Sequence, residues 1–136
     1  MAGSIRFVHD RATDVHIAYV KWLIETEGDC RVWHKQLEEY FEQFDHKLDI
    51  VYVCDDLRLG PKIGPTWGKY RADLNARFTR YSVRVHVDAK VAAYTATSGI
   101  IHGVSFDQAA DVPTAIEFIK EQRRRADVDA KGRGVA

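Results

Sequence analysis

The chain has 136 residues, of which 46% are hydrophobic and 29% charged, and its twenty basic residues balance its twenty acidic ones. This length suits one domain with a single buried core, and the zero net charge gives no electrostatic reason to expect nucleic acid or an anionic membrane as a partner. No apolar run approaches the roughly 20 residues of a membrane span, and the N-terminus lacks a secretory signal pattern, so we expect a cytoplasmic protein with reduced cysteines.

Two strands and a helix are predicted in the first third of the chain. Residues 4–9 and 15–22 are rich in β-branched and aromatic residues, and the polar segment between them is typical of a hairpin turn. A helix is then predicted at about 30–45, with Asp29 as its N-cap. Its apolar residues recur at three- and four-residue steps: Trp33, Leu37, Tyr40, Phe41 and Phe44. We expect this stripe to pack in the core rather than to hold a cofactor.

The middle of the chain predicts a buried strand, a loop and a second helix. Residues 48–54, LDIVYVC, are nearly all apolar, which indicates a central parallel strand covered on both faces. After a loop with two aspartates, glycines and prolines, apolar residues return at helical spacing over 65–78. The alternating segment 81–87, YSVRVHV, indicates the next strand.

A third helix is predicted at 88–98, with Asp88 as its N-cap, and a last short strand around 104–106. The segment 94–105 also gathers hydroxyl groups and glycines. Together with Cys54, the residues Ser98 and His102 would offer a nucleophile and a base. A better explanation of the pattern is that the hydroxyl groups form hydrogen bonds at a helix C-terminus.

A closing helix is predicted at 112–125, with Asp111 as its cap and a proline in its first turn. The three consecutive arginines at 123–125 then form its solvated end, where cations suit the helix dipole. The remaining residues lack periodicity, so the domain is expected to span residues 1–126, followed by a flexible tail over 127–136.

The element order is therefore ββαβαβαβα, a single α/β domain with a mixed, mostly parallel sheet of four to five strands and about four helices. This order resembles the STAS domains of bacterial anti-sigma-factor antagonists, the SpoIIAA-like family, over roughly residues 4–125. In that family a central strand leads into a loop that presents a serine or threonine at a helix start. The matching loop here has no serine, and Thr66 is the hydroxyl residue closest to the family's phosphoacceptor position.

The resemblance implies a non-catalytic signalling or scaffold module. A protein partner, or a second copy of the chain, would bind at the loop and helix start over residues 55–70. The residues expected at this surface are Asp55, Asp56, Lys62, Ile63, Thr66 and Trp67. Thr66 is a possible phosphoacceptor, but a helix cap is its commoner role, so we expect binding without phosphorylation.

Other chemistry has weaker support in the sequence. Asp55 and Asp56 are adjacent on an extended segment, so their side chains point to opposite sides. They cannot easily act together as a general acid and a general base, and we therefore expect no enzyme. The six histidines have neither HxH nor HxxxH spacing, and no nucleotide-binding glycine motif occurs, so neither metal nor cofactor is predicted. An alternative function is carriage of a small apolar, lipid-like ligand between sheet and helices.

Overall fold

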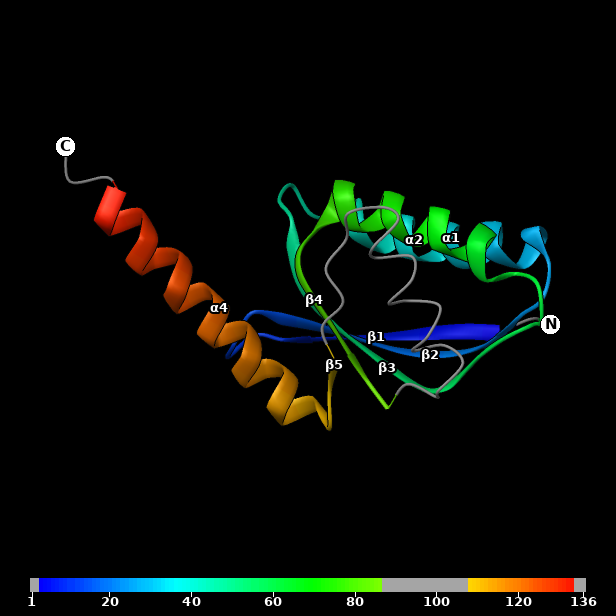
Figure 1. The fold of residues 1–136 in the computed structure, drawn as a ribbon, viewed down its shortest axis with the longest axis horizontal. Helices are drawn as coiled ribbons and strands as arrows, with labels where there is room; N and C mark the ends of the chain where they lie inside the picture. Colours follow the sequence, from blue (N-terminus) through cyan, green and yellow to red (C-terminus); the bar gives the residue numbers. More distant parts are fainter. Residues whose placement is uncertain (1–2, 87–107, 134–136) are drawn as a thin grey trace.

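A computed structural model describes residues 3–86 and 108–133 of the chain. In these ranges it contains one five-stranded sheet in the order β1-β2-β3-β4-β5, together with the helices α1, α2 and α4 (Figure 1). Only β1 and β2 pair antiparallel, while β2, β3, β4 and β5 run parallel. The predicted α/β class and central position of the 48–54 strand are therefore confirmed.

The hairpin of β1 (Gly3–Asp10) and β2 (Val15–Ile24) is also confirmed. Helix α1 (Glu27–Phe41) begins and ends a few residues earlier than predicted. Its N-cap is Thr26 rather than Asp29, and Asp29 is the third residue after this cap. The two residues form a capping box. The Asp29 N–H donates to the Thr26 hydroxyl, and the Thr26 N–H donates to the Asp29 carboxylate, both at 3.1 Å.

Strand β3 (Leu48–Leu59) continues five residues beyond the predicted end at Cys54. The pairing register slips between Tyr19 and Lys21, which lie opposite Val53 and Asp56 respectively, so β3 bulges by one residue. At this bulge two consecutive aspartates face solvent, which breaks the alternation that marks a strand in the sequence. Beyond it Leu57 is buried again, and the strand continues.

Helix α2 (Gly64–Phe78) and strand β4 (Thr79–Val85) agree with the predicted elements to within about two residues. Strand β5 (Gln108–Ala109) has two residues and pairs with β4. The predicted helix at 88–98 and strand at 104–106 lie outside the described residues, as does the segment 94–105 with Ser98 and His102.

Helix α4 (Val112–Arg133) has the predicted start, because the Thr114 N–H donates to the Asp111 carboxylate at 2.8 Å. It does not end near residue 125, so the tail predicted over 127–136 is helical as far as Arg133. The first half of α4 is packed on the sheet, so its second half can extend the helix without an apolar stripe of its own. Alanine, lysine and arginine in this second half favour the helical state. Pairs of Glu121 with Arg124 and Arg125 support this part of the helix.

The sheet separates two apolar layers (Figure 1). Helices α1 and α2 cover one face, where Trp33, Leu37 and Trp67 pack with the β2 and β3 side chains. Helix α4 packs on the other face through Ala115 and Ile119. Within residues 3–86 and 108–133, no helix is both long and apolar enough to cross a membrane.

We predict that both cysteines resist thiol reagents in the native protein. Cys30 is fully buried and Cys54 is 2% exposed, and burial raises the pKa of the Cys30 thiol to about 11. Because only the thiolate reacts, the native thiols should react with Ellman's reagent at pH 8 at least about 100-fold more slowly than an unfolded cysteine. Two thiols should appear in guanidinium chloride. A fast native phase of one equivalent would contradict this.

Candidate functional site

The segment predicted to bind a partner divides into an exposed part and a buried part. Asp55, Asp56 and Lys62 are exposed, and Thr66 is half-buried. Ile63 and Trp67 are 7% and 3% exposed and belong to the core beneath α1 and α2. The two apolar residues therefore anchor the loop and are not available as contact residues in this structure.

Thr66 does not cap helix α2, which corrects the role expected for it. The N-cap position is held by Ile63, and the helix starts at Gly64 with a proline in its first turn. Proline suits this turn because its missing N–H would have no intrahelical acceptor there. Thr66 is thus the third helical residue, where backbone N–H groups carry the positive end of the helix dipole.

We use the term β3–α2 surface for the exposed residues of this region: Asp55, Asp56, Arg58, Pro61, Lys62 and the half-buried Thr66. Asp55 forms an ion pair with His86 at 2.8 Å, and Arg58 donates to the backbone oxygens of Asp55 and Leu57 at 2.8 and 2.9 Å. These contacts brace the bulged part of the strand. A groove of about 580 Å³ borders Asp56 and Arg58 and includes Leu23, which is 48% exposed.

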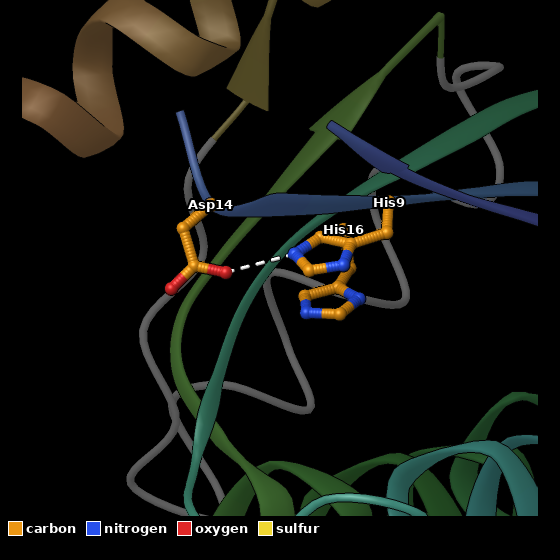
Figure 2. A group of neighbouring side chains, drawn as sticks. All are labelled: His9, Asp14 and His16. Atoms are coloured by element: carbon orange, nitrogen blue, oxygen red, sulfur yellow. Dashed lines mark hydrogen bonds and ion pairs between the residues drawn. The ribbon is translucent and has the colours of Figure 1, made fainter. Parts of the chain in front are cut away.

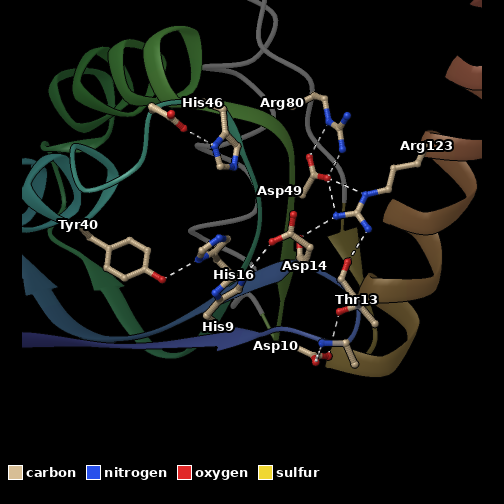
Figure 3. Close-up of polar contacts among 12 residues, drawn as sticks. His9, Asp10, Thr13, Asp14, His16, Tyr40, His46, Asp49, Arg80 and Arg123 are labelled. Carbon is tan, nitrogen blue, oxygen red and sulfur yellow. Dashed lines mark hydrogen bonds and ion pairs between the residues drawn. The ribbon is translucent and has the colours of Figure 1, made fainter.

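A second polar group lies at the opposite end of the strands, where β2, β3 and β4 begin (Figure 3). Its centre is Asp49, whose side chain is 2% exposed. Arg80 donates to this carboxylate through Nε at 3.0 Å, and Arg123 donates through Nε at 2.8 Å. The Nη2 atom of Arg123 also lies within ion-pair distance of the carboxylate, at 2.7 Å. Arg123 also donates to the backbone oxygens of Thr13 and Asp14, so one guanidinium ties α4 to the β1–β2 turn.

This network was not predicted from the sequence, where the three consecutive arginines placed Arg123 at a solvated helix end. That assignment is wrong, because Arg123 lies in the middle of α4 and its side chain is 24% exposed. Arg124 and Arg125 are exposed as predicted. The sequence does contain one signal for the network, which is Asp49 at the start of an otherwise apolar strand. A carboxylate that is buried in such a strand requires a cationic partner.

Histidines from both strands of the hairpin form a third group beside this network (Figure 2). His9 and His16 are register partners, and their rings stack with centroids 4.0 Å apart. His9 Nε2 lies 2.8 Å from Asp14 Oδ1, and His16 Nδ1 lies 2.6 Å from the Tyr40 hydroxyl. Burial, followed by the nearby His9, lowers the pKa of His16 to about 4, so this buried imidazole is neutral at neutral pH.

The space between sheet and helices is small. A cavity on this side of the sheet has a volume of only about 20 Å³, and it is bounded by Trp33, Tyr52, Trp67 and Arg71. The indole N–H groups of Trp33 and Trp67 are buried there and have no hydrogen-bond partner among the described residues. A volume of this size holds about one water molecule, which could accept from these donors.

Comparisons with known proteins agree with the architecture. No family model matches the sequence, and no curated protein matches it. Among solved structures, the chain is similar to a variant of RsbS from Moorella thermoacetica that carries a serine-to-glutamate substitution, with a TM-score of 0.61 and 13% identity. The match covers 88% of this chain and 97% of that chain. The chain has a STAS-like fold. The STAS-like fold places the β3–α2 surface at the carboxyl end of the central strand.

Proposed function

We propose that this chain is a non-catalytic signalling or scaffold module that binds a protein partner through the β3–α2 surface. One observation carries the proposal: an exposed charged segment is held between buried anchors on both sides. Cys54 is buried before the segment, and Ile63 and Trp67 are buried after it. Leu57 and Leu59 are buried between its charged residues. A segment fixed in this way loses little conformational entropy when it binds.

The chemistry of the surface favours a protein partner. Asp56 and Lys62 place charges of both signs on the surface, while the adjoining groove contains the exposed apolar side chain of Leu23. An apolar centre with a charged rim is the usual composition of a protein interface, in which the rim charges set orientation and specificity. The likeness to RsbS supports this proposal at the level of the fold.

The alternative of a lipid-like ligand finds no support in the described residues. The space between sheet and helices, at about 20 Å³, is that of a single water molecule. A lipid would need a pocket of several hundred cubic ångströms. We therefore propose binding of a partner rather than carriage of a ligand.

We predict that reversing two surface charges will abolish partner capture. Asp56→Lys combined with Lys62→Glu should reduce the amount of partner recovered from host lysate at least about 10-fold, because each reversal opposes a partner charge. Thr66→Ala should recover the same amount as wild type, since binding is proposed to need no phosphate. Recovery is measured by quantitative mass spectrometry of proteins bound to the immobilised chain.

Lys120→Glu is the matched control, because it reverses an exposed charge on α4. Ile63→Asp would be less informative, since it puts a carboxylate into the core and tests folding instead. Undiminished capture by the double variant would overturn the assignment of the surface. Loss of capture by Thr66→Ala, together with a phosphate on Thr66 of the wild type, would show that the threonine works as a switch. Recovery of the chain alone would point to a homo-oligomer, which native mass spectrometry would size.

A further inference from the structure

We propose that His9, Asp14 and His16 bind one divalent transition-metal ion of the Zn²⁺ type (Figure 2). Each residue offers one ligand atom, and the three atoms lie within 4.8 Å of one another. Two imidazole nitrogens and one carboxylate oxygen are a ligand set that Zn²⁺ accepts, and three protein ligands leave a fourth position open. This site is independent of the β3–α2 surface, which lies at the other end of the strands.

The hairpin register brings the two histidines together. His9 on β1 lies directly opposite His16 on β2, although six residues separate them in the chain. Side chains of such cross-strand partners begin only about 4.5–5.5 Å apart. Their parallel rings, with 7° between the planes, show that both imidazoles already occupy the same side of the hairpin. The backbone therefore needs no rearrangement to present them to one ion.

The third ligand is placed by an ordered turn. Asp14 has a φ of 52°, in the left-handed region that aspartate tolerates better than most residues. The Asp10 carboxylate accepts from Ala12 N at 3.2 Å and from the Thr13 hydroxyl at 2.9 Å, which closes the turn. Arg123 Nη2 donates to the Asp14 backbone oxygen at 2.8 Å from the other side. The main chain that carries Asp14 is thus fixed beside the two histidines.

The surroundings of His16 suit a ligand. The Tyr40 hydroxyl occupies Nδ1 at 2.6 Å and leaves Nε2 for the ion (Figure 3). A metal-bound histidine commonly donates from its second nitrogen, here to the Tyr40 oxygen, and this contact fixes the ring orientation. Phe44 packs edge-on against the same imidazole, with centroids 4.8 Å apart. One side of the site is therefore apolar and the other polar.

To complete the coordination, the His9 ring would turn out of its stack on His16, because a metal ion lies close to the plane of each imidazole that binds it. Ligand atoms of a tetrahedral zinc ion lie about 3.3 Å apart, given bonds of about 2.0–2.1 Å. His9 Nε2 and Asp14 Oδ1, now 2.8 Å apart, would separate slightly. The Asp14 and His9 side chains are 67% and 31% exposed, so both can turn. A polar pocket of about 170 Å³ borders Asp14 and His16 and offers an entry path and room for a water ligand.

A second group of possible metal ligands contains a histidine but is less suited to bind an ion. His34, Glu38 and Asp73 also lie close enough to share an ion. However, Arg77 forms ion pairs with both carboxylates, at 2.7 Å to Glu38 and 2.9 Å to Asp73. A metal ion there would have to displace a guanidinium. At the hairpin, no such cation contacts the Asp14 carboxylate among the described ion pairs, so the metal is assigned to the hairpin.

The test is titration of the tag-free, EDTA-treated full chain with ZnCl₂ in a calorimeter. We expect one equivalent to bind with a Kd of about 1 µM or tighter. His9→Gln and Asp14→Asn should each weaken binding at least about 10-fold, which is the smallest loss usual for residues that support a metal. At the same Zn²⁺ concentration the Tm of the wild type should rise more than the Tm of either variant, because an ion stabilises the state that binds it in proportion to its affinity.

His34→Gln serves as the control, since it removes a histidine from the other group and should bind Zn²⁺ like the wild type. His9 and Asp14 are not buried, so both variants should keep the native circular dichroism spectrum. Three results would overturn the proposal: no saturable binding below about 100 µM, equal affinity in the hairpin variants, or loss of binding in His34→Gln.

Discussion

Replacing Asp49 with alanine should lower the free energy of unfolding by about 3–5 kcal/mol. Its buried carboxylate accepts from Arg80, from Arg123 and from the Tyr81 N–H, and it thereby joins β3, β4 and α4. Removal would leave two guanidinium groups without their shared anion. Because the Arg80 side chain is 53% exposed and can turn to water, the lower end of this range is expected. Urea denaturation followed by circular dichroism gives the measurement.

Glu121→Ala is the control for this experiment. Glu121 is also an acidic partner of arginines, but its ion pairs with Arg124 and Arg125 lie on the exposed side of α4. Such pairs contribute little in water, so the urea midpoint should not change measurably. If Asp49→Ala cost less than about 1 kcal/mol, the network would be replaceable by solvent, and its role in holding α4 to the sheet would be refuted.

Replacing Trp67 with alanine should cost about 3–5 kcal/mol. Trp67 is 3% exposed, and its ring centroid lies 5.7 Å from that of Trp33 on α1. Truncation would remove this contact between the two helices and leave a cavity beside the loop that precedes α2. The loss should be smaller in Trp67→Phe, which keeps part of the packing. Chemical denaturation of both variants measures the change in the free energy of unfolding, and the curves are fitted with one common slope m of free energy against denaturant concentration.

Lys69→Ala provides the matched control on the same helix, because Lys69 is exposed and should be replaceable within about 0.5 kcal/mol. A loss below about 1 kcal/mol for Trp67→Ala would mean that the indole contributes little to the core. In that case Trp67 would return to the β3–α2 surface as a candidate hot-spot residue.

The predicted elements succeeded where the local pattern was regular. Residues 48–54 form a nearly continuous apolar run, and they became the central strand with parallel neighbours on both sides. The errors occurred where the local pattern is interrupted or absent. The bulge at Asp55 and Asp56 hid the second half of β3, since two outward residues in succession mimic a strand end. The charged part of α4 was taken for a tail because it has no apolar face of its own.

The candidate sites were accessible to sequence reasoning to different degrees. The β3–α2 surface was located from a predicted strand end and a glycine-proline loop, which are local signals, although Ile63 and Trp67, which were expected at this surface, are buried. The histidine site was missed because its residues have no metal-ligand spacing. One signal was present: a hairpin turn centred between residues 9 and 16 makes them cross-strand partners.

Element types, and with them the α/β class, followed from periodicity alone, because alternation and helical spacing are properties of a few neighbouring residues. The convergence of Asp49 with Arg80 and Arg123, which lie 31 and 74 residues further along the chain, depends instead on strand register and on the path of α4. The same is true of the stacked pair His9 and His16. Register and packing are set by long-range burial, so only the tertiary structure decided which polar side chains meet.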